Sequence, residues 1–171
     1  HRYGAVNGRF TVDDRLVTIL GHPAFAGFAR LVMPRVDLDI DPDAKVASIA
    51  STLPYHQHVE PHVVVTALNR IVDDVAAGRV VFFNIYDEAE KQRVPSKIET
   101  GLFFFRGKPG APFAIIAPGG GFAYVGSVHE GFPYAVEINK RGYNAFVLRY
   151  RVGYGGAVAT EDLATAISYV F

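Results

Sequence analysis

A run of three glycines, Gly119, Gly120 and Gly121, follows an apolar segment of the chain. The surrounding residues 112–124 read Pro-Phe-Ala-Ile-Ile-Ala-Pro-Gly-Gly-Gly-Phe-Ala-Tyr. The tetrahedral intermediate of acyl transfer carries a negative oxygen, which backbone N–H groups aimed at one point can stabilise. Glycines let the backbone approach such an oxygen closely because they have no side chain. The pattern therefore predicts a loop that can bind an oxyanion.

The same glycines could bind phosphate, but neither common phosphate motif is present. A dinucleotide-binding loop requires Gly-x-Gly-x-x-Gly, and Tyr124 stands where its last glycine belongs. A P-loop requires Gly-Lys followed by Ser or Thr, whereas Gly121 is followed by Phe-Ala-Tyr. A glycine-rich turn without a chemical role remains as the structural alternative.

The chain contains no nucleophile elbow of the form Gly-x-Ser-x-Gly. Its serines are Ser48, Ser51, Ser96, Ser127 and Ser168, and none stands between glycines at that spacing. Ser127 comes nearest, in Val-Gly-Ser-Val-His, but it follows the glycines too closely to form an independent elbow. We expect it to cap the next helix instead. Without a nucleophile this chain alone is expected to be nearly inert as an ester hydrolase.

Histidine and glutamate, two residue types that bind metals, alternate just before the first long helix. The four residues are His56, His58, Glu60 and His62. On an extended segment all four would share one face, as a metal site requires. Pro61 ends that extension before the last histidine. The cluster is interpreted as solvated or locally hydrogen-bonded, and no metal site is predicted from it.

A second alternating cluster consists of aspartates. A calcium-binding loop needs Gly and Glu at the positions that Pro42 and Ser48 occupy here. The cluster is therefore interpreted as a solvated acidic turn. Its members are Asp37, Asp39, Asp41 and Asp43.

The hydrophobic pattern predicts the elements that position the glycines. A helix over 61–77 has apolar residues at helical spacing, Pro61 in its first turn and Gly78 after its end. Residues 1–60 show no lasting period and are interpreted as an irregular extension with short helical turns. Strands are predicted over 79–86, 100–105, 113–117 and 145–150, with the charged stretch between the first two as a polar loop. A helix is predicted over about 130–141, and a last helix is capped by Thr160.

These elements predict an α/β fold with a mostly parallel sheet and flanking helices. The short apolar runs at 113–117 and 145–150 are typical of strands covered on both faces. With the helix between them they form a right-handed βαβ unit. The chain divides at residue 78 into an N-terminal extension, 1–78, and an α/β part, 79–171. Arg149 and Arg151 end the strand at 145–150 and are expected to form structural ion pairs.

The overall composition excludes several classes of partner. The 171 residues are half hydrophobic, which is enough for a substantial core. The 17 basic and 17 acidic side chains balance, so we expect no nucleic-acid partner. The chain has no cysteine and no apolar run long enough to span a membrane.

Four segments between Gly101 and Gly153 resemble the front half of esterase/lipase-type α/β-hydrolases. They read Leu-Phe-Phe-Phe-Arg-Gly, Pro-Gly-Gly-Gly-Phe, His-Glu-Gly-Phe-Pro-Tyr-Ala and Gly-Tyr-Asn-Ala-Phe-Val-Leu-Arg-Tyr-Arg-Val. The carbohydrate-esterase and acetyl-xylan-esterase members are the most similar. The family usually has His before the glycines, where this chain has Pro118, a variant found in acetyl-xylan-esterase-like members.

The resemblance implies a site built from the glycine loop. The amides of Gly120 and Gly121 would be the oxyanion-hole donors, and Gly119 and Phe122 would shape the loop. It also implies a small-molecule or carbohydrate ester as substrate and no cofactor. The nucleophile, the acid and the catalytic His would lie in a C-terminal portion that follows this chain. Tyr124 and His129 are further candidates for substrate contact.

An incomplete hydrolase domain would leave part of its sheet uncovered. We expect the strand at 145–150 to present an unpaired edge, covered by the rest of the polypeptide, by a second chain or by a second copy. The leading hypothesis is the N-terminal portion of a serine esterase. The alternative is a non-catalytic binding or structural module derived from a hydrolase, possibly dimeric.

Overall fold

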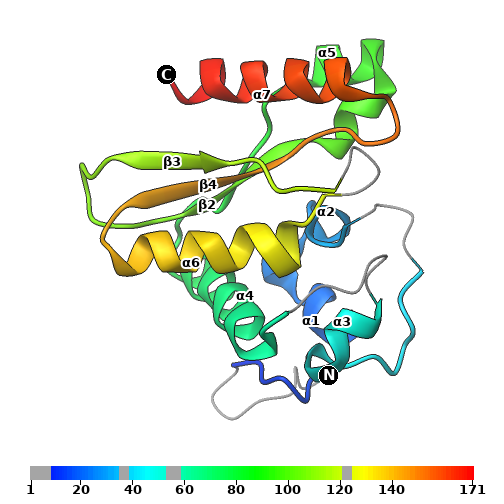
Figure 1. Cartoon of the computed structure of the whole chain (residues 1–171), viewed down its shortest axis with the longest axis vertical. Coiled ribbons are helices and arrows are strands. Elements are labelled where there is room, and N and C mark those ends of the chain that lie inside the picture. Colours follow the sequence, from blue (N-terminus) through cyan, green and yellow to red (C-terminus); the bar gives the residue numbers. More distant parts are fainter. Residues whose placement is uncertain (1–8, 35–38, 53–58, 121–124) are drawn as a thin grey trace.

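The glycine loop follows an edge strand of a four-stranded sheet in the computed structural model, which describes residues 9–34, 39–52, 59–120 and 125–171. The sheet order is β1-β2-β4-β3. Helices cover both faces, so the α/β class is confirmed (Figure 1). The strands are β1 (Phe82–Phe83), β2 (Gly101–Phe105), β3 (Phe113–Ile116) and β4 (Asn144–Arg149).

The sheet is mixed, and the prediction of a mostly parallel sheet is wrong. β3 and β4 pair in parallel, across the predicted βαβ connection. β1 with β2 and β2 with β4 pair antiparallel. A short link at 106–112 joins β2 to β3, and a link of that length reverses the chain, whereas parallel strands need a longer crossover. The apolar pattern of β2 and β4 marks their burial but not their direction. The expectation that 113–117 is covered on both faces is wrong, because β3 is an outer strand whose residues are exposed or only partly buried.

Among the described residues β1 and β3 are the outer strands of the sheet, so the unpaired edge predicted on the strand at 145–150 is wrong. β4 pairs with β2 on one side, where Leu102 faces Leu148, and with β3 on the other. Among the described residues β3 has a partner on one side only. Any strand that extended the sheet beside β3 would meet Phe113, which is 38% exposed.

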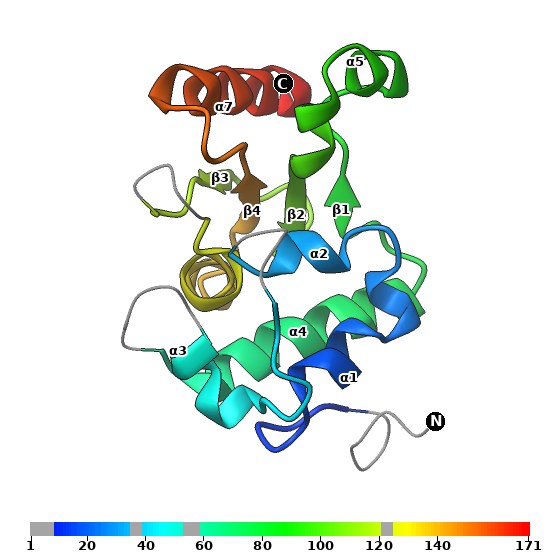
Figure 2. The same ribbon diagram turned by 90° about the vertical axis from the view of Figure 1, so that its right-hand side faces the viewer.

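Two hydrophobic clusters lie on opposite faces of the sheet. Alternate residues of β4 point to opposite sides, so Ala145 and Val147 enter one cluster and Leu148 enters the other. The larger cluster lies under α6 (Phe132–Lys140), α4 (Pro61–Ala76) and the N-terminal helices. The smaller lies under α7 (Gly156–Val170) (Figure 2).

The helix predicted over 61–77 is α4, with Pro61 as its first residue and Gly78 beyond its end at φ 76°. Its apolar face packs in the larger cluster, where Leu68 joins Phe103 of β2. The N-terminal segment adds buried residues such as Phe25 to that cluster. Its short helices are α1 (Leu16–Leu20), η2 (Pro23–Phe25), α2 (Ala29–Val32), η3 (Val46–Ser48) and α3 (Ile49–Thr52).

Three local predictions were wrong. The strand expected over 79–86 is only Phe82–Phe83, and the following charged stretch, expected as a loop, forms α5 (Glu88–Arg93) and η4 (Pro95–Glu99). Asp87 caps α5 by accepting the N–H of Glu90 at 2.7 Å. The last helix begins at Gly156 and not after Thr160, whose hydroxyl donates to the Gly156 carbonyl.

In the described part of the chain no helix is both long and apolar enough to cross a bilayer.

Candidate functional site

The glycine loop begins where β3 ends, beside the carboxyl end of its parallel neighbour β4. In open α/β sheets ligands bind outside the carboxyl ends of parallel strands. The structure describes Gly119 and Gly120 at this position. Gly121, Phe122 and Tyr124 lie outside the described residues.

Hydrogen bonds fix the start of the loop on two sides. Tyr150, just after β4, donates its hydroxyl to the carbonyl of Pro118. Gly119 donates its N–H to Oε1 of Glu130 at 3.1 Å and accepts the N–H of Gly126 at 3.1 Å. Both backbone groups of Gly119 are therefore engaged by the segment that enters α6.

Gly120 differs from its neighbour in that its N–H remains available. Within the described ranges no hydrogen bond uses this amide. Proline has no N–H, and the amide of Gly119 is taken by Glu130. Gly120 is therefore the first residue of the loop that could donate to a ligand.

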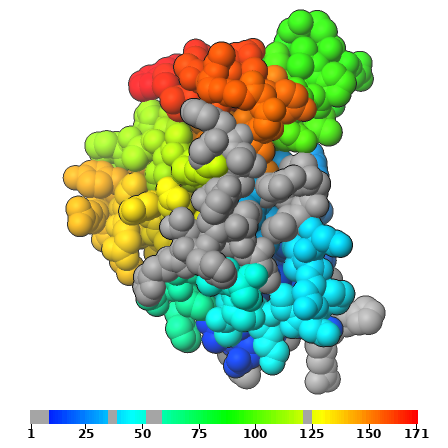
Figure 3. Space-filling model, turned by 45° about the vertical axis from the view of Figure 1, so that its right-hand side comes forward, coloured from blue at the N-terminus to red at the C-terminus, as the bar shows by residue number. Residues whose placement is uncertain are grey.

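A cavity of about 300 Å³, here the glycine-loop cavity, adjoins these residues. Its other wall comes from the end of β4 and from α7, and Figure 3 shows the segment before residue 120 directly beneath the orange α7 residues. Apolar side chains dominate that wall, with the Thr160 hydroxyl as a polar exception. The lining residues are Ala117, Pro118, Gly119, Gly120, Leu148, Tyr150, Ala159, Thr160 and Leu163.

The connection into α6 is a π-helical turn, η5 (Ser127–Gly131), packed tightly against the sheet. A Cβ at Gly131 would come within 2.6 Å of Val147 and 2.8 Å of Pro118. Only glycine fits there, so the turn can touch both β4 and the start of the glycine loop. This close contact brings Glu130 within reach of Gly119.

Ser127 does not cap the helix, and the prediction that it does so is wrong. Gly126 occupies the N-cap position and no side chain caps the turn. The Ser127 side chain is fully buried, and within the described residues its Oγ has no hydrogen-bond partner. Activation of a serine requires a base hydrogen-bonded to its hydroxyl, and this part of the chain shows no such bond at Ser127.

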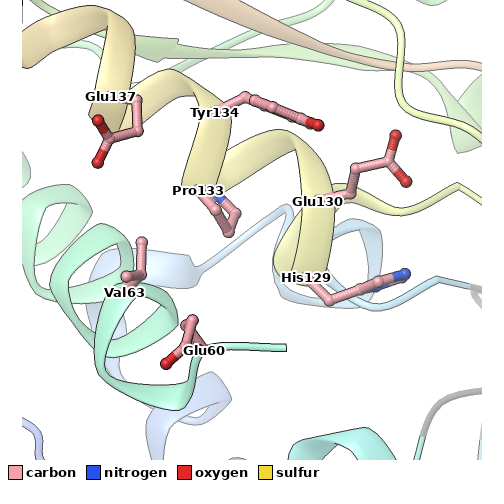
Figure 4. Close-up of a pocket in the computed structure, with 7 residues that line it drawn as sticks. All are labelled: Glu60, Val63, His129, Glu130, Pro133, Tyr134 and Glu137. Carbon is pink, nitrogen blue, oxygen red and sulfur yellow. The ribbon is translucent and has the colours of Figure 1, made fainter. Parts of the chain in front are cut away.

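His129, a candidate for substrate contact, lines a different cavity from the glycines. It is 7% exposed, and burial lowers the pKa of its imidazole while Glu130 opposes that shift. This second cavity, of about 480 Å³, lies between the start of α4 and the first turns of α6 (Figure 4). Its lining residues are Glu60, Val63, His129, Glu130, Pro133, Tyr134 and Glu137.

The two arginines at the end of β4 have different partners. Arg151 pairs with Asp162 at 2.8 Å and with Glu161 at 3.1 Å, so its predicted structural ion pair is confirmed. Arg149 forms no ion pair within the described residues, against the prediction. Its guanidinium donates to the backbone carbonyls of Leu31 and Met33, which ties the N-terminal segment to the sheet.

Neither polar cluster of the N-terminal region forms a metal site among the described residues. Three members of these clusters lie outside the described residues, namely Asp37, His56 and His58. Glu60 is the N-cap residue of α4, and His62 is the second residue of that helix. The remaining aspartates line a surface cavity of about 440 Å³ together with Ser48 and Ser51. They are Asp39, Asp41 and Asp43, and the last donates its N–H to the carboxylate of Asp41.

The sequence did not indicate how two residues, Glu130 and Tyr150, shape the site. It placed Glu130 with His129 at the helix start, either bordering a substrate pocket or in a capping and packing role, and it placed Tyr150 only at the end of a strand. Their partners are backbone atoms of the glycine loop, 11 and 32 residues away in the sequence. No local spacing rule encodes such contacts.

No protein-family model and no curated protein match this chain. Among solved structures, the chain is similar over 52% of its length to the acetyl ester-xyloside bifunctional hydrolase from Caldicellulosiruptor lactoaceticus. The two share 25% sequence identity with a TM-score of 0.44. The match covers 35% of that hydrolase, so the similar part is about a third of its length.

Proposed function

We propose that this chain supplies the oxyanion-binding loop of a serine-type carboxylic-ester hydrolase. The observation that carries the proposal is the N–H of Gly120, which has no hydrogen-bond partner among the described residues and belongs to a residue that lines the glycine-loop cavity. In α/β-hydrolases one oxyanion donor comes from the loop between the third strand and the following helix. The glycine loop between β3 and α6 has that place in the order of elements.

In the proposed reaction the Gly120 amide, with the Gly121 amide after it, donates to the oxygen that becomes negative when a nucleophile attacks the ester carbonyl. Preorganised N–H donors of this kind stabilise the developing charge because they need no reorganisation during the reaction. The attacking Ser and its His and Asp or Glu partners would come from polypeptide outside this chain, since the sequence has no nucleophile elbow.

The glycine-loop cavity also supports the choice of substrate class. Leu148, Ala159 and Leu163 give it an apolar wall, and about 300 Å³ is the lower end of the size range of small-molecule sites. A short acyl group fits such a wall, and the alcohol portion, whether small or a carbohydrate, would then extend outward.

The test is hydrolysis of p-nitrophenyl acetate by the full-length gene product. The first variant is Gly120→Val. Valine keeps the N–H, but its branched side chain is strained at the φ of 155° that Gly120 adopts, so we expect the amide to move out of place. The expected fall in kcat is about 10²–10³-fold, the usual effect of losing one oxyanion donor. Gly110→Asn is the matched control, because Gly110 precedes β3 at its far end, has φ 74° and has open space around it. Asparagine tolerates that backbone conformation.

Two results would contradict the proposal. The first is a full-length product that does not hydrolyse the ester, which favours a non-catalytic binding module. The second is a Gly120→Val variant that is folded and as active as Gly110→Asn.

A further inference from the structure

We propose that Glu130 is the positioning residue of the oxyanion loop, and that it acts by holding the Gly119 amide so that the next amide, that of Gly120, faces the cavity. This inference rests on the proposed function. In this arrangement the π-helical turn before α6 fixes the direction of the Gly120 N–H, which the glycines alone leave undetermined.

The first step of the argument concerns the planarity of the peptide between Gly119 and Gly120. A trans peptide is planar, so its C=O and N–H point in opposite directions, and the described chain has no cis peptide. The carbonyl of Gly119 accepts the N–H of Gly126, at the start of the π-helical turn. The N–H of Gly120 therefore points away from that turn.

The second step is that one such bond does not fix a glycine. Without a side chain, Gly119 has a wide choice of φ and ψ, and the peptides on either side of it can rotate. The bond from its N–H to Oε1 of Glu130 fixes the preceding peptide as well. With both peptides held, the direction of the Gly120 donor is determined before any ligand binds.

The third step is that the surroundings of Glu130 are built to hold its carboxylate at this place. Its own N–H donates to the carbonyl of Gly126 at 3.0 Å, so Glu130, Gly126 and Gly119 are linked in a ring of three hydrogen bonds. A Cβ at Gly126 would lie 3.1 Å from Oε2 of Glu130, so glycine leaves the room that the carboxylate needs.

The task depends on an acceptor oxygen at this place. A carboxylate oxygen and an amide oxygen can both accept the bond, although a bond to an ionised carboxylate is the stronger one. Figure 4 shows the Glu130 carboxylate leaving the turn on the same side as the His129 ring, whereas Glu137 lies farther along α6. Glu137 pairs instead with Lys140 at 2.8 Å.

The experiment compares three variants in the full-length gene product. Glu130→Ala removes the acceptor, Glu130→Asp shortens the side chain by one methylene, and Glu130→Gln keeps an oxygen that can accept the bond. Glu137→Gln is the matched control, because it removes a carboxylate from the adjoining helix α6 that pairs with Lys140 and not with the loop. Two quantities are measured, namely hydrogen exchange of the Gly119 amide by NMR and the steady-state kinetics of p-nitrophenyl acetate hydrolysis.

We expect Glu130→Ala and Glu130→Asp to speed Gly119 exchange by about tenfold or more, because a local hydrogen bond is lost. We expect kcat to fall by about 10²-fold while KM changes by less than about threefold, since the misplaced donor acts in the transition state. Glu130→Gln restores most of kcat and most of the protection. Glu137→Gln matches the wild type in both measurements.

Three results would overturn the inference. Gly119 exchange unchanged in the folded Glu130→Asp variant would mean that the carboxylate does not hold the amide. Faster exchange with an unchanged kcat would mean that the held amide does not matter for the reaction. A Glu130→Gln variant as impaired as Glu130→Asp would assign the effect to charge. Failure of the proposed function is separate, because it appears as a Gly120→Val variant that keeps full activity.

Discussion

Arg149 and Arg151, two residues apart at the end of β4, are both almost completely buried but have opposite environments. Arg149 faces the helix-rich side and reaches only backbone carbonyls, and burial lowers its pKa to about 10. Arg151 faces α7 and meets Asp162, which raises its pKa despite the burial. The buried charge of Arg149 is thus stabilised by backbone carbonyl dipoles on one face of the sheet, and that of Arg151 by a carboxylate on the other.

This difference shows how the end of one strand can be fixed from both sides. Arg149 attaches the N-terminal segment, which carries Met33, to β4, and Arg151 attaches α7. Tyr150 lies between the two arginines and donates to Pro118, the residue before the glycines. The residue that anchors the glycine loop is therefore flanked in the sequence by one arginine attached to each face of the sheet.

The largest expected effect is on the α7 face, from Asp162→Ala. The fully buried Asp162 carboxylate accepts bonds from the Arg151 guanidinium and from the Tyr86 hydroxyl. Its removal leaves the buried Arg151 with the half-exposed Glu161 as its remaining carboxylate partner among the described residues, and loss of a buried partner costs about 3–5 kcal/mol. Urea unfolding measures the change.

Glu161→Gln provides the control for that variant. Glu161 also pairs with Arg151, but its side chain is 52% exposed. Exposed ion pairs contribute about 0–1 kcal/mol. Equal losses for the two variants would show that the α7 face does not depend on a buried carboxylate.

A smaller effect is expected on the other face, from Arg149→Met. The substitution removes a buried charge together with an Nε that has no partner, and it leaves the carbonyl of Met33 without this donor. An orphaned acceptor costs about 1–3 kcal/mol, and loss of the buried charge offsets part of this. A loss as large as that of Asp162→Ala, measured in the same urea experiment, would contradict the comparison of the two faces.

The sequence predicted the elements better than their directions. The helix at 61–77 and the strands at 100–105, 113–117 and 145–150 were found because their burial pattern is local. The antiparallel pairing of β2 was missed because a strand buried on both faces reads the same in either direction. α5 was also missed, although Asp87 followed by Glu90 three residues later is a recognisable N-terminal signal.

The sequence predicted which backbone segment forms the site, but not the side chains that hold this segment in place. The glycines indicated where amide donors could gather, but the role of each depends on bonds to Glu130, Gly126 and Tyr150. The sequence could not show that Gly119 is engaged while Gly120 is not. It also could not separate Arg149 from Arg151, because their partners come from segments distant along the chain.

Tyr86→Phe tests the polar network of the α7 face through pH. Burial raises the pKa of the Tyr86 phenol to about 12, and Asp162 adds to the shift. An unfolded tyrosine loses its proton near pH 10, so between pH 10 and 12 the folded state holds more protons than the unfolded state. The stability that Tyr86 contributes is therefore complete below pH 10 and is lost as the pH rises toward 12.

The measurement is the difference in unfolding free energy between wild type and Tyr86→Phe at pH 8, 10 and 11. At pH 8 we expect about 1.5 kcal/mol, the lower end of the contribution of a hydrogen bond to a charged group. Arg149 titrates in the same window with the opposite sign, because its lowered pKa makes stability rise with pH. Its contribution cancels in the difference, so a difference that does not shrink above pH 10 would contradict the assignment.

Tyr150→Phe has the smallest expected effect on stability, about 0.5–1.5 kcal/mol for one hydrogen bond. It removes the donor to the Pro118 carbonyl and leaves both arginines in place. If the end of β4 anchors the glycine loop, exchange of the hydrogen-bonded Gly119 amide should rise more than exchange in β2 and β4. An equal rise in amide exchange in the loop and in the strands would mean that Tyr150 stabilises the whole sheet. The contacts at the end of β4 would then support the core and have no particular role in the glycine loop.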